Sequence, residues 1–194
     1  MFNDNIICDK TDEELVALTL DSQGNFLHII NRYEEKLKRY IRRITNVNED
    51  DVEDILQEVF IKVYKNLNSF DKDLKFSSWI YRITHNHVIS EARKRQARVE
   101  VIPGEDNDNI LKNIRSDIEI EEEIDYNYLK ENIDIILEKI DTKYREVLIL
   151  KYLEEKDYKE ISDILKKPMG TVATLLNRAK KKFFEETRKE NIKI

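Results

Sequence analysis

The chain has 194 residues, of which 38% are charged and 40% hydrophobic, and its 34 basic and 40 acidic residues give a formal net charge of −6. Three glycines and two prolines are too few turn-forming residues for a β-sandwich or barrel, and the glycines stand too far apart for a phosphate-binding loop. The single cysteine, Cys8, excludes an internal disulfide and a cysteine-based zinc site. No apolar run approaches the ~20 residues that span a bilayer, and the first ten residues lack the pattern of a signal peptide. We therefore expect a cytoplasmic, all-α protein.

The first half of the chain carries the periodicity of amphipathic helices. Thr11 and Glu14 have the spacing of a capping box, which predicts a short helix. Asn25 is a candidate cap for the next helix, and Asn48 precedes three acidic residues that suit the positive end of a helix dipole. A further helix contains Trp79. The predicted helices cover about 11–20, 26–44, 49–67 and 76–98.

Composition changes sharply between residues 100 and 125. This segment has 10 acidic and 2 basic residues, a balance of −8, and it contains Pro103 and Gly104. Such a composition is typical of a linker. Two interpretations stay open: an ordinary solvated linker, or an acidic mimic that shields a basic DNA-binding face.

The second half has the pattern of a helix-turn-helix. Apolar residues recur at helical spacing over 129–140 and 144–152. A short helix from Tyr158 to about Leu165 is followed by a connection with Pro168 and by a helix from about 170 to 184.

The second of these helices has two distinct faces. One face is apolar, and the opposite face has hydroxyl, amide and basic groups that can meet DNA bases and phosphates. Residues 156–189 contain 10 basic and 5 acidic residues, against the negative charge of the whole chain. We favour DNA binding over an ordinary helical hairpin. The apolar face holds Val172, Leu176, Ala179 and Phe183, and the polar face holds Thr171, Thr174, Asn177, Arg178 and Lys181.

The Trp79 helix is a second candidate for nucleic-acid binding. From residue 75 to 98 it has 6 basic residues and 1 acidic residue. Aromatic and cationic groups together suit single-stranded DNA, whereas a buried tryptophan beneath a solvated basic face is the structural alternative. The run His85-Asn-His87 is no nuclease or metal motif, because residues two apart on a helix point about 200° apart. We expect no transition-metal site and no enzymatic activity, since no arrangement of nucleophile and base is visible.

The helix 51–67 presents a mixed face. Charged and polar residues stand beside apolar and aromatic ones, and such a surface is typical of protein binding as well as of simple core packing.

Three motifs in this order resemble an extracytoplasmic-function (ECF) sigma factor of bacterial RNA polymerase. They are Asp54-Ile-Leu-Gln-Glu-Val-Phe-Ile-Lys-Val-Tyr64, Phe76-Ser-Ser-Trp-Ile-Tyr-Arg-Ile83 with Asn86, and Pro168-Met-Gly-Thr-Val172 with Asn177-Arg-Ala-Lys180. The resemblance implies sigma region two at 1–98, an acidic flexible linker at 99–125, and sigma region four, with its helix-turn-helix, at 126–194. The fold class is then all-α, with two small helical domains.

The resemblance also assigns roles to residues. Core RNA polymerase, through its β′ clamp helices and β flap, and promoter DNA become the expected partners, an anti-sigma factor is allowed, and no cofactor is implied. The implied clamp contacts are Asp54, Gln57, Glu58, Phe60, Ile61 and Tyr64. Recognition and melting of the −10 element falls to Lys75, Phe76, Trp79, Arg82, His85, Asn86 and Arg93, with Trp79 also a candidate for the core. The −35 element falls to Thr171, Thr174, Asn177, Arg178, Lys180 and Lys181.

The chain departs from the family pattern at a few positions. Ala173 and Leu175 replace basic residues, Ser90 replaces an aspartate, and the glycine of the turn is replaced near Lys166. With fewer phosphate contacts, we expect weak binding to duplex DNA by the isolated protein and productive recognition only together with polymerase. The alternative function is a stand-alone helix-turn-helix transcriptional regulator.

Overall fold

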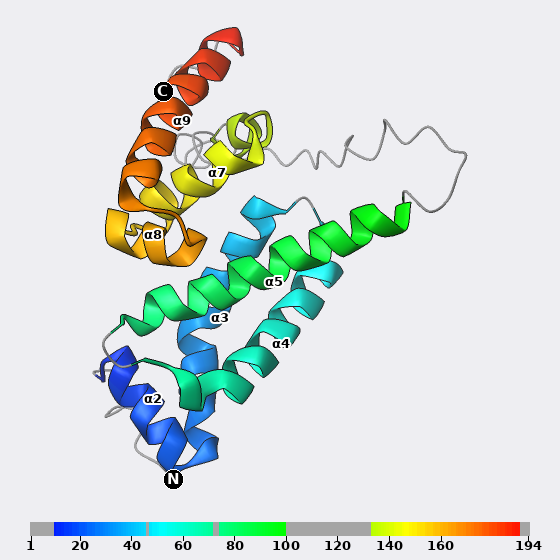
Figure 1. Ribbon diagram of the computed structural model, residues 1–194. Coiled ribbons are helices and arrows are strands. Elements are labelled where there is room, and N and C mark those ends of the chain that lie inside the picture. Colours follow the sequence, from blue (N-terminus) through cyan, green and yellow to red (C-terminus); the bar gives the residue numbers. More distant parts are fainter. Residues whose placement is uncertain (1–9, 46, 72–73, 100–132, 191–194) are drawn as a thin grey trace, which may run out of the picture.

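The computed structural model describes residues 10–45, 47–71, 74–99 and 133–190, and each element assigned in these ranges is helical (Figure 1). The expectation of an all-α fold is thereby confirmed. In the same ranges, no helix has the length and apolarity needed to cross a membrane. Cys8 and the acidic linker, apart from Val99, lie outside the described residues.

The N-terminal unit contains the predicted capping box at Thr11, and the side chain of Asn48 caps the helix with the acidic first turn. The Thr11 hydroxyl accepts a hydrogen bond from the Glu14 N–H at 3.2 Å, and the Glu14 carboxylate accepts one from the Thr11 N–H at 2.7 Å. The Asn48 side chain accepts from the Asp51 N–H at 2.8 Å. Asn25 instead donates from its amide to the Leu18 carbonyl at 2.9 Å, so the side chain ties two helices together without capping either. The helices are α2 (Asp12–Asp21), α3 (Phe26–Ile44), α4 (Glu49–Asn66) and α5 (Phe76–Val99), with 3₁₀ turns η1 (Gln23–Asn25) and η2 (Leu67–Ser69).

The core of this unit lies where α3, α4 and α5 pack against one another. Its largest fully buried side chains, Tyr40, Tyr81 and Phe76, come from α3 and α5. Full burial of one large apolar side chain contributes about 1.5–3 kcal/mol, so these three residues contribute substantially to the stability of the unit.

The C-terminal unit contains the predicted helix-turn-helix. Residues 133–138 are helical, and α7 (Thr142–Leu148), the π-helical segment η3 (Ile149–Leu153), α8 (Tyr158–Leu165) and α9 (Met169–Lys189) follow. Asp157 and Glu160 form a capping box at the start of α8. Lys166 ends α8 with φ 50°, the left-handed conformation that favours glycine. The family's glycine is therefore missing at the position where the backbone favours glycine. A lysine in this conformation lowers the free energy of unfolding by about 1 kcal/mol.

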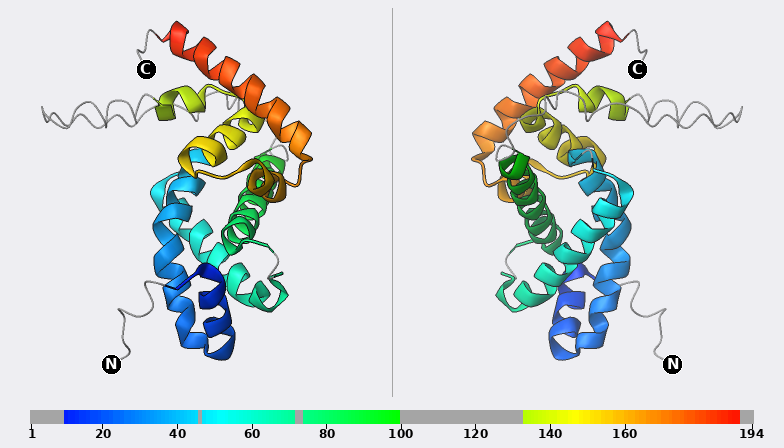
Figure 2. Two further views of the ribbon diagram at one scale, coloured as in Figure 1. Left: turned by 90° about the vertical axis from the view of Figure 1, so that its left-hand side faces the viewer. Right: turned by 90° about the vertical axis from the view of Figure 1, so that its right-hand side faces the viewer.

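The two units pack against each other. α8 lies along α5, and α7 meets the C-terminal part of α3, as the two side views also show (Figure 2). One continuous set of buried apolar residues runs through both units. The helix-turn-helix thus rests on the helix that contains Trp79.

Candidate functional site

The outer face of α4 carries the predicted protein-binding residues. Asp54, Gln57 and Glu58 are exposed, and Ile61 and Tyr64 keep 51% and 38% of their surfaces accessible. Exposed Ile and Tyr between carboxylates form a mixed surface of the kind found at protein interfaces.

Phe60 differs from the other five residues of the predicted contact set on α4. It is 8% exposed and meets Phe26 edge to face, with ring centroids 6.3 Å apart. Tyr64 lies against the same ring at 5.0 Å. In this arrangement Phe60 supports the surface from below and offers little of itself to a partner.

An aromatic cluster lies under the N-terminal end of α5. Phe76 is fully buried, and its ring centroid lies 5.7 Å from that of Tyr33, 5.4 Å from that of Phe70 and 5.6 Å from that of Trp79. Although the resemblance counted Phe76 among residues for DNA, it has no accessible surface here and belongs to the core. Trp79, at 5% exposed, is mostly core as well.

A polar pocket of about 380 Å³ opens beside Trp79, between α4, η2 and α5. Asn86 is exposed at this pocket. Amide, hydroxyl and ammonium groups next to the indole ring can hydrogen-bond the edge of a base while the ring supports its face. Of the predicted −10 residues, the pocket brings together only Trp79 and Asn86. The full lining is Lys62, Asn66, Ser69, Trp79, Ile83, Asn86, His87 and Ser90.

The remaining predicted residues of α5 behave in two ways. Arg93, near the C-terminal end, is exposed. His85 is 8% exposed, and its Nδ1 lies 3.1 Å from the Tyr40 hydroxyl. Burial lowers the pKa of His85 to about 4, so the ring is neutral at pH 7.

The basic and hydroxyl groups at the start of α5 are paired with acids of the C-terminal unit. Arg82 meets Asp163 at 2.7 Å, with side chains 20% and 27% exposed. Lys75 lies 3.5 Å from a carboxylate oxygen of Asp157 and of Glu160. We call these pairs, together with the Tyr81–Glu154 contact, the interdomain latch.

The Tyr81–Glu154 contact adds a buried carboxylate to the latch. The Tyr81 hydroxyl donates to Glu154 at 2.5 Å, and Arg43 lies 3.7 Å from the other oxygen of that carboxylate. Burial raises the pKa of Glu154 above its ordinary value. The latch therefore holds acidic groups of the C-terminal unit against residues at the start of α5 that the sequence predicts to contact the −10 element.

The second helix of the helix-turn-helix presents the predicted polar face. Val172, Leu176 and Ala179 are buried. All six residues assigned to the −35 element are exposed on α9. Lys180 stands apart from the other five, because its ammonium lies 5.5 Å from the centre of the Tyr152 ring on another side of the helix.

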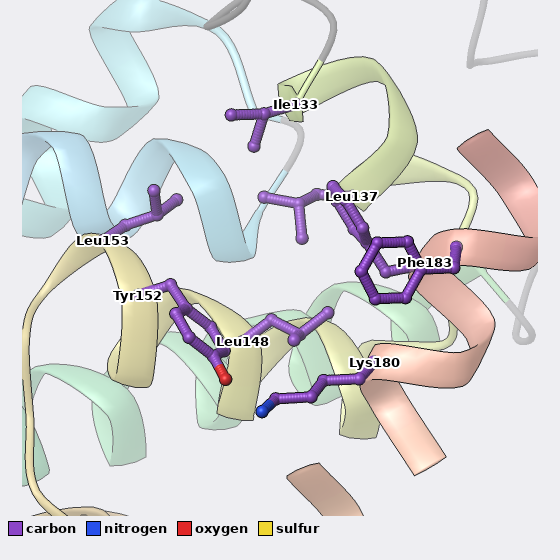
Figure 3. Close-up of a pocket in the computed structure, with 8 residues that line it drawn as sticks. Ile133, Leu137, Leu148, Tyr152, Leu153, Lys180 and Phe183 are labelled. Atoms are coloured by element: carbon purple, nitrogen blue, oxygen red, sulfur yellow. The ribbon is translucent and has the colours of Figure 1, made fainter. Parts of the chain in front are cut away.

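An apolar groove of about 380 Å³ lies on that other side (Figure 3). Tyr152 and Phe184, at its edge, are 50% and 57% exposed. Lys180 is the basic group at the rim. The groove is therefore separate from the polar stripe of α9. It is lined by Ile133, Leu137, Leu148, Tyr152, Leu153, Lys180, Phe183 and Phe184.

Comparison with known proteins bears on these surfaces. Residues 29–98 match the family Sigma-70 region 2, and residues 130–183 match Sigma-70, region 4. The ECF RNA polymerase sigma factor SigW of Bacillus subtilis (strain 168) is 34% identical over 171 residues, which cover 86% of this chain and 90% of SigW. The chain belongs to the ECF sigma factors.

Further relatives agree with this assignment. The ECF RNA polymerase sigma-E factor of Escherichia coli (strain K12) is 30% identical over 180 residues, covering 88% of this chain and 91% of the relative. In fold, the chain is similar to CnrH in its complex with the cytosolic domain of CnrY, with a TM-score of 0.65 at 24% identity over 91% of this chain and 96% of that one. It is also similar to the sigma factor RpoE of Bartonella quintana in complex with the anti-sigma factor NepR, with a TM-score of 0.67 at 18% identity over 84% and 97% of the two chains.

The protein is therefore an RNA polymerase sigma factor that directs transcription initiation. A stand-alone regulator explains the helix-turn-helix but not the region 2 match over residues 29–98. Sequence reasoning missed two groups: the pocket residues from α4 and η2, and the acidic partners of the latch. No local signal could have found either, because both depend on which helices pack together.

Proposed function

We propose that the three surfaces divide the work of a sigma factor. The outer face of α4 binds the β′ clamp helices, the pocket beside Trp79 holds an unstacked base of the −10 element, and the polar face of α9 reads the −35 element in duplex form. The protein acts in the cytoplasm by binding and strand separation, without covalent catalysis. We place region two at 1–98, the linker at 99–125 and region four at 126–194.

The observation that carries the −10 assignment is the pocket itself. Its volume lies within the range typical of ligand sites, and Asn86 projects at its mouth beside the Trp79 ring. Taking a base out of the stack costs a few kcal/mol. Base stacking on an accessible aromatic ring contributes about 1–3 kcal/mol. Because Trp79 is 5% exposed, the polar groups of the pocket and backbone contacts must supply most of what offsets this cost.

Region four supplies the second contact with polymerase. The apolar groove lies on a different side of α9 from the stripe with Thr171 and Arg178, so it stays accessible while that stripe lies on DNA. We assign the groove to an apolar segment of the β flap. The Bartonella RpoE is bound to an anti-sigma factor, and a partner of that kind is proposed for this chain too.

The latch adds an order of events. With the acids of region four on Lys75 and Arg82, the start of α5 is covered in the free protein. Core polymerase, by holding the regions apart, would free these residues for the −10 element. The isolated protein then binds promoter DNA weakly for two reasons: the start of α5 is covered by region four, and few phosphate contacts are available.

Run-off transcription tests the function. Purified core polymerase would be used on a pooled library of bacterial promoter fragments, with and without the protein. New, discrete start sites that need the protein are expected, and they reveal both promoter elements. If no new start sites appear and core polymerase is not retained by the immobilised protein, the assigned α4 surface is wrong.

A further inference from the structure

One cluster of potential metal ligands lies where two of these surfaces meet, because Glu58 belongs to the outer face of α4 and His87 lines the pocket beside Trp79. His87 and Glu91 stand four residues apart on α5, so both side chains lie on the same face of the helix. Glu58 reaches them from α4, and one ligand atom of each of the three residues lies within 4.8 Å of the other two. Two ligands from one turn and a third from the facing helix can enclose a small cation.

The histidine supplies independent support. His87 is 3% exposed, and its Nε2 is buried without a well-formed hydrogen bond, while it points at the Glu58 carboxylate 3.2 Å away. Tetrahedral zinc sites with bonds of about 2.0–2.1 Å place their ligand atoms about 3.3 Å apart. Nε2 and the Glu58 oxygen already have that separation. The Glu58 carboxylate is the group that faces the buried nitrogen in the free protein, so a cation entering between them would meet two ligand atoms that already point at each other.

We propose that Glu58, His87 and Glu91 form a binding site for a divalent cation of the Zn²⁺ class. One imidazole and two carboxylates are donors that zinc accepts, and the exposed Glu58 side leaves a fourth position for water. The proposal does not depend on the promoter-binding roles, because it concerns the packing of α4 on α5 in the free protein.

Two lysine ammonium groups contact the proposed ligands in the free protein. The Lys62 ammonium contacts Nδ1 of His87, and Lys94 pairs with Glu91 at 2.7 Å. An ammonium can only donate, so Nδ1 accepts in this state and the ring proton is on Nε2. When Zn²⁺ binds Nε2, the neutral ring changes tautomer: Nε2 gives its proton to water, Nδ1 takes one up from water, and the exposed Lys62 side chain moves into solvent. The cation thus displaces Lys62, and Lys62 weakens its binding.

The test titrates the full-length protein with Zn²⁺ in a calorimeter and with Co²⁺ by absorption, which reports tetrahedral coordination. All proteins carry Cys8→Ser, so that no thiolate can supply a ligand. One ion per chain is expected. Glu58→Gln and Glu91→Gln each weaken binding by roughly tenfold or more. Lys62→Met tightens it about tenfold, because an adjacent positive charge is removed.

Glu53→Gln is the matched control. Glu53 is an exposed glutamate of α4 that pairs with Lys38 and stands outside the cluster, so its variant binds like the parent protein. Circular dichroism of the variants without metal shows that each is folded. The proposal is overturned if the parent protein binds no Zn²⁺, or if Glu58→Gln and Glu91→Gln bind as tightly as Glu53→Gln. The calorimetric and absorption titrations contain neither DNA nor polymerase, so a failure of the proposed promoter-binding roles would not change either outcome.

Discussion

Weakening the interdomain latch should increase the affinity of the free protein for the −10 element. The Arg82–Asp163 pair is suited to this test because it joins a residue of α5 to a residue of α8 at 2.7 Å. Asp163→Asn removes the charge and keeps the shape, and Asp163→Arg places two guanidinium groups together. Both variants change region four only and leave all proposed DNA contacts of α5 intact.

The size of the effect follows from the burial of the pair. Exposed ion pairs contribute about 0.2–1 kcal/mol, and a partly desolvated pair contributes more, up to an upper limit of about 4 kcal/mol. The second carboxylate oxygen of Asp163 is buried without a hydrogen bond, which offsets part of the gain. A net contribution of about 1 kcal/mol corresponds to about a fivefold shift toward the open form. Repulsion in Asp163→Arg adds about the same again, for a total of about thirtyfold.

Fluorescence anisotropy with a single-stranded −10 oligonucleotide measures the change. When most molecules are closed, the apparent affinity rises in proportion to the open fraction. Any loss of negative charge favours DNA, so Asp141→Asn, an exposed acid of the same region, is the control. If both Asp163 variants bind the oligonucleotide no better than Asp141→Asn, the latch does not cover the −10 surface.

Four further predictions concern two buried titratable groups and the two DNA surfaces. The free energy of unfolding should fall by about 3 kcal/mol at most as the pH drops from 6.5 to 4, because His85 takes up a proton in the unfolded chain but not in the folded protein, where its pKa is about 4. In a series of urea midpoints measured over this pH range, His85→Gln should therefore reduce the pH dependence. Burial raises the pKa of Glu146 to about 6, so its ionised form opposes folding above that pH, and Glu146→Gln should gain about 2 kcal/mol at pH 8 but little at pH 4.5 in the same series. In the holoenzyme, Asn86→Ala should lower affinity for a fork template with a melted −10 element about fivefold, whereas Asn31→Ala, an exposed asparagine of α3, should not. Arg178→Ala should weaken binding only to templates that contain the −35 element, and an equal loss on templates without it would contradict a role in reading sequence.

The parts of the fold that follow from short-range pattern could be predicted from the sequence. The Thr11 capping box and the apolar stripe of α9 each depend on residues three or four apart, and both are confirmed, as is the acidic first turn of α4 that follows Asn48. The left-handed residue at Lys166 coincides with the missing glycine for the same reason. Local spacing fixes which side of a helix a residue lies on, and that was enough to place the polar face of α9.

The composition of the sites could not be predicted in this way. The pocket beside Trp79 draws Lys62 and Ser69 from elements that only tertiary packing brings to α5. Phe76 shows the reverse case. The family motif counts it among the residues for DNA, whereas its helical spacing places it on the core face, and there it is buried. For the proposed cation site, the His87–Glu91 spacing was visible in the sequence, whereas the contribution of Glu58 from α4 was not.

Charge density along the sequence does not identify the acids that cover the basic start of α5. The linker has the highest acidic density, −8 over residues 100–125, yet the acids in contact with Lys75 and Arg82 come from α8. At physiological salt, the interaction between solvent-exposed charges is largely screened beyond about 8 Å, so acids in direct contact with Lys75 and Arg82 act on them most strongly. The two kinds of shield respond differently to salt. A contact latch that is partly buried keeps most of its strength between 50 and 300 mM NaCl, whereas a solvated acidic segment loses its effect. The ratio of oligonucleotide affinities between Asp163→Asn and the parent protein should therefore stay nearly constant over that range, and a ratio that collapses to one at high salt would show that diffuse charge, and not the α5–α8 contact, limits access.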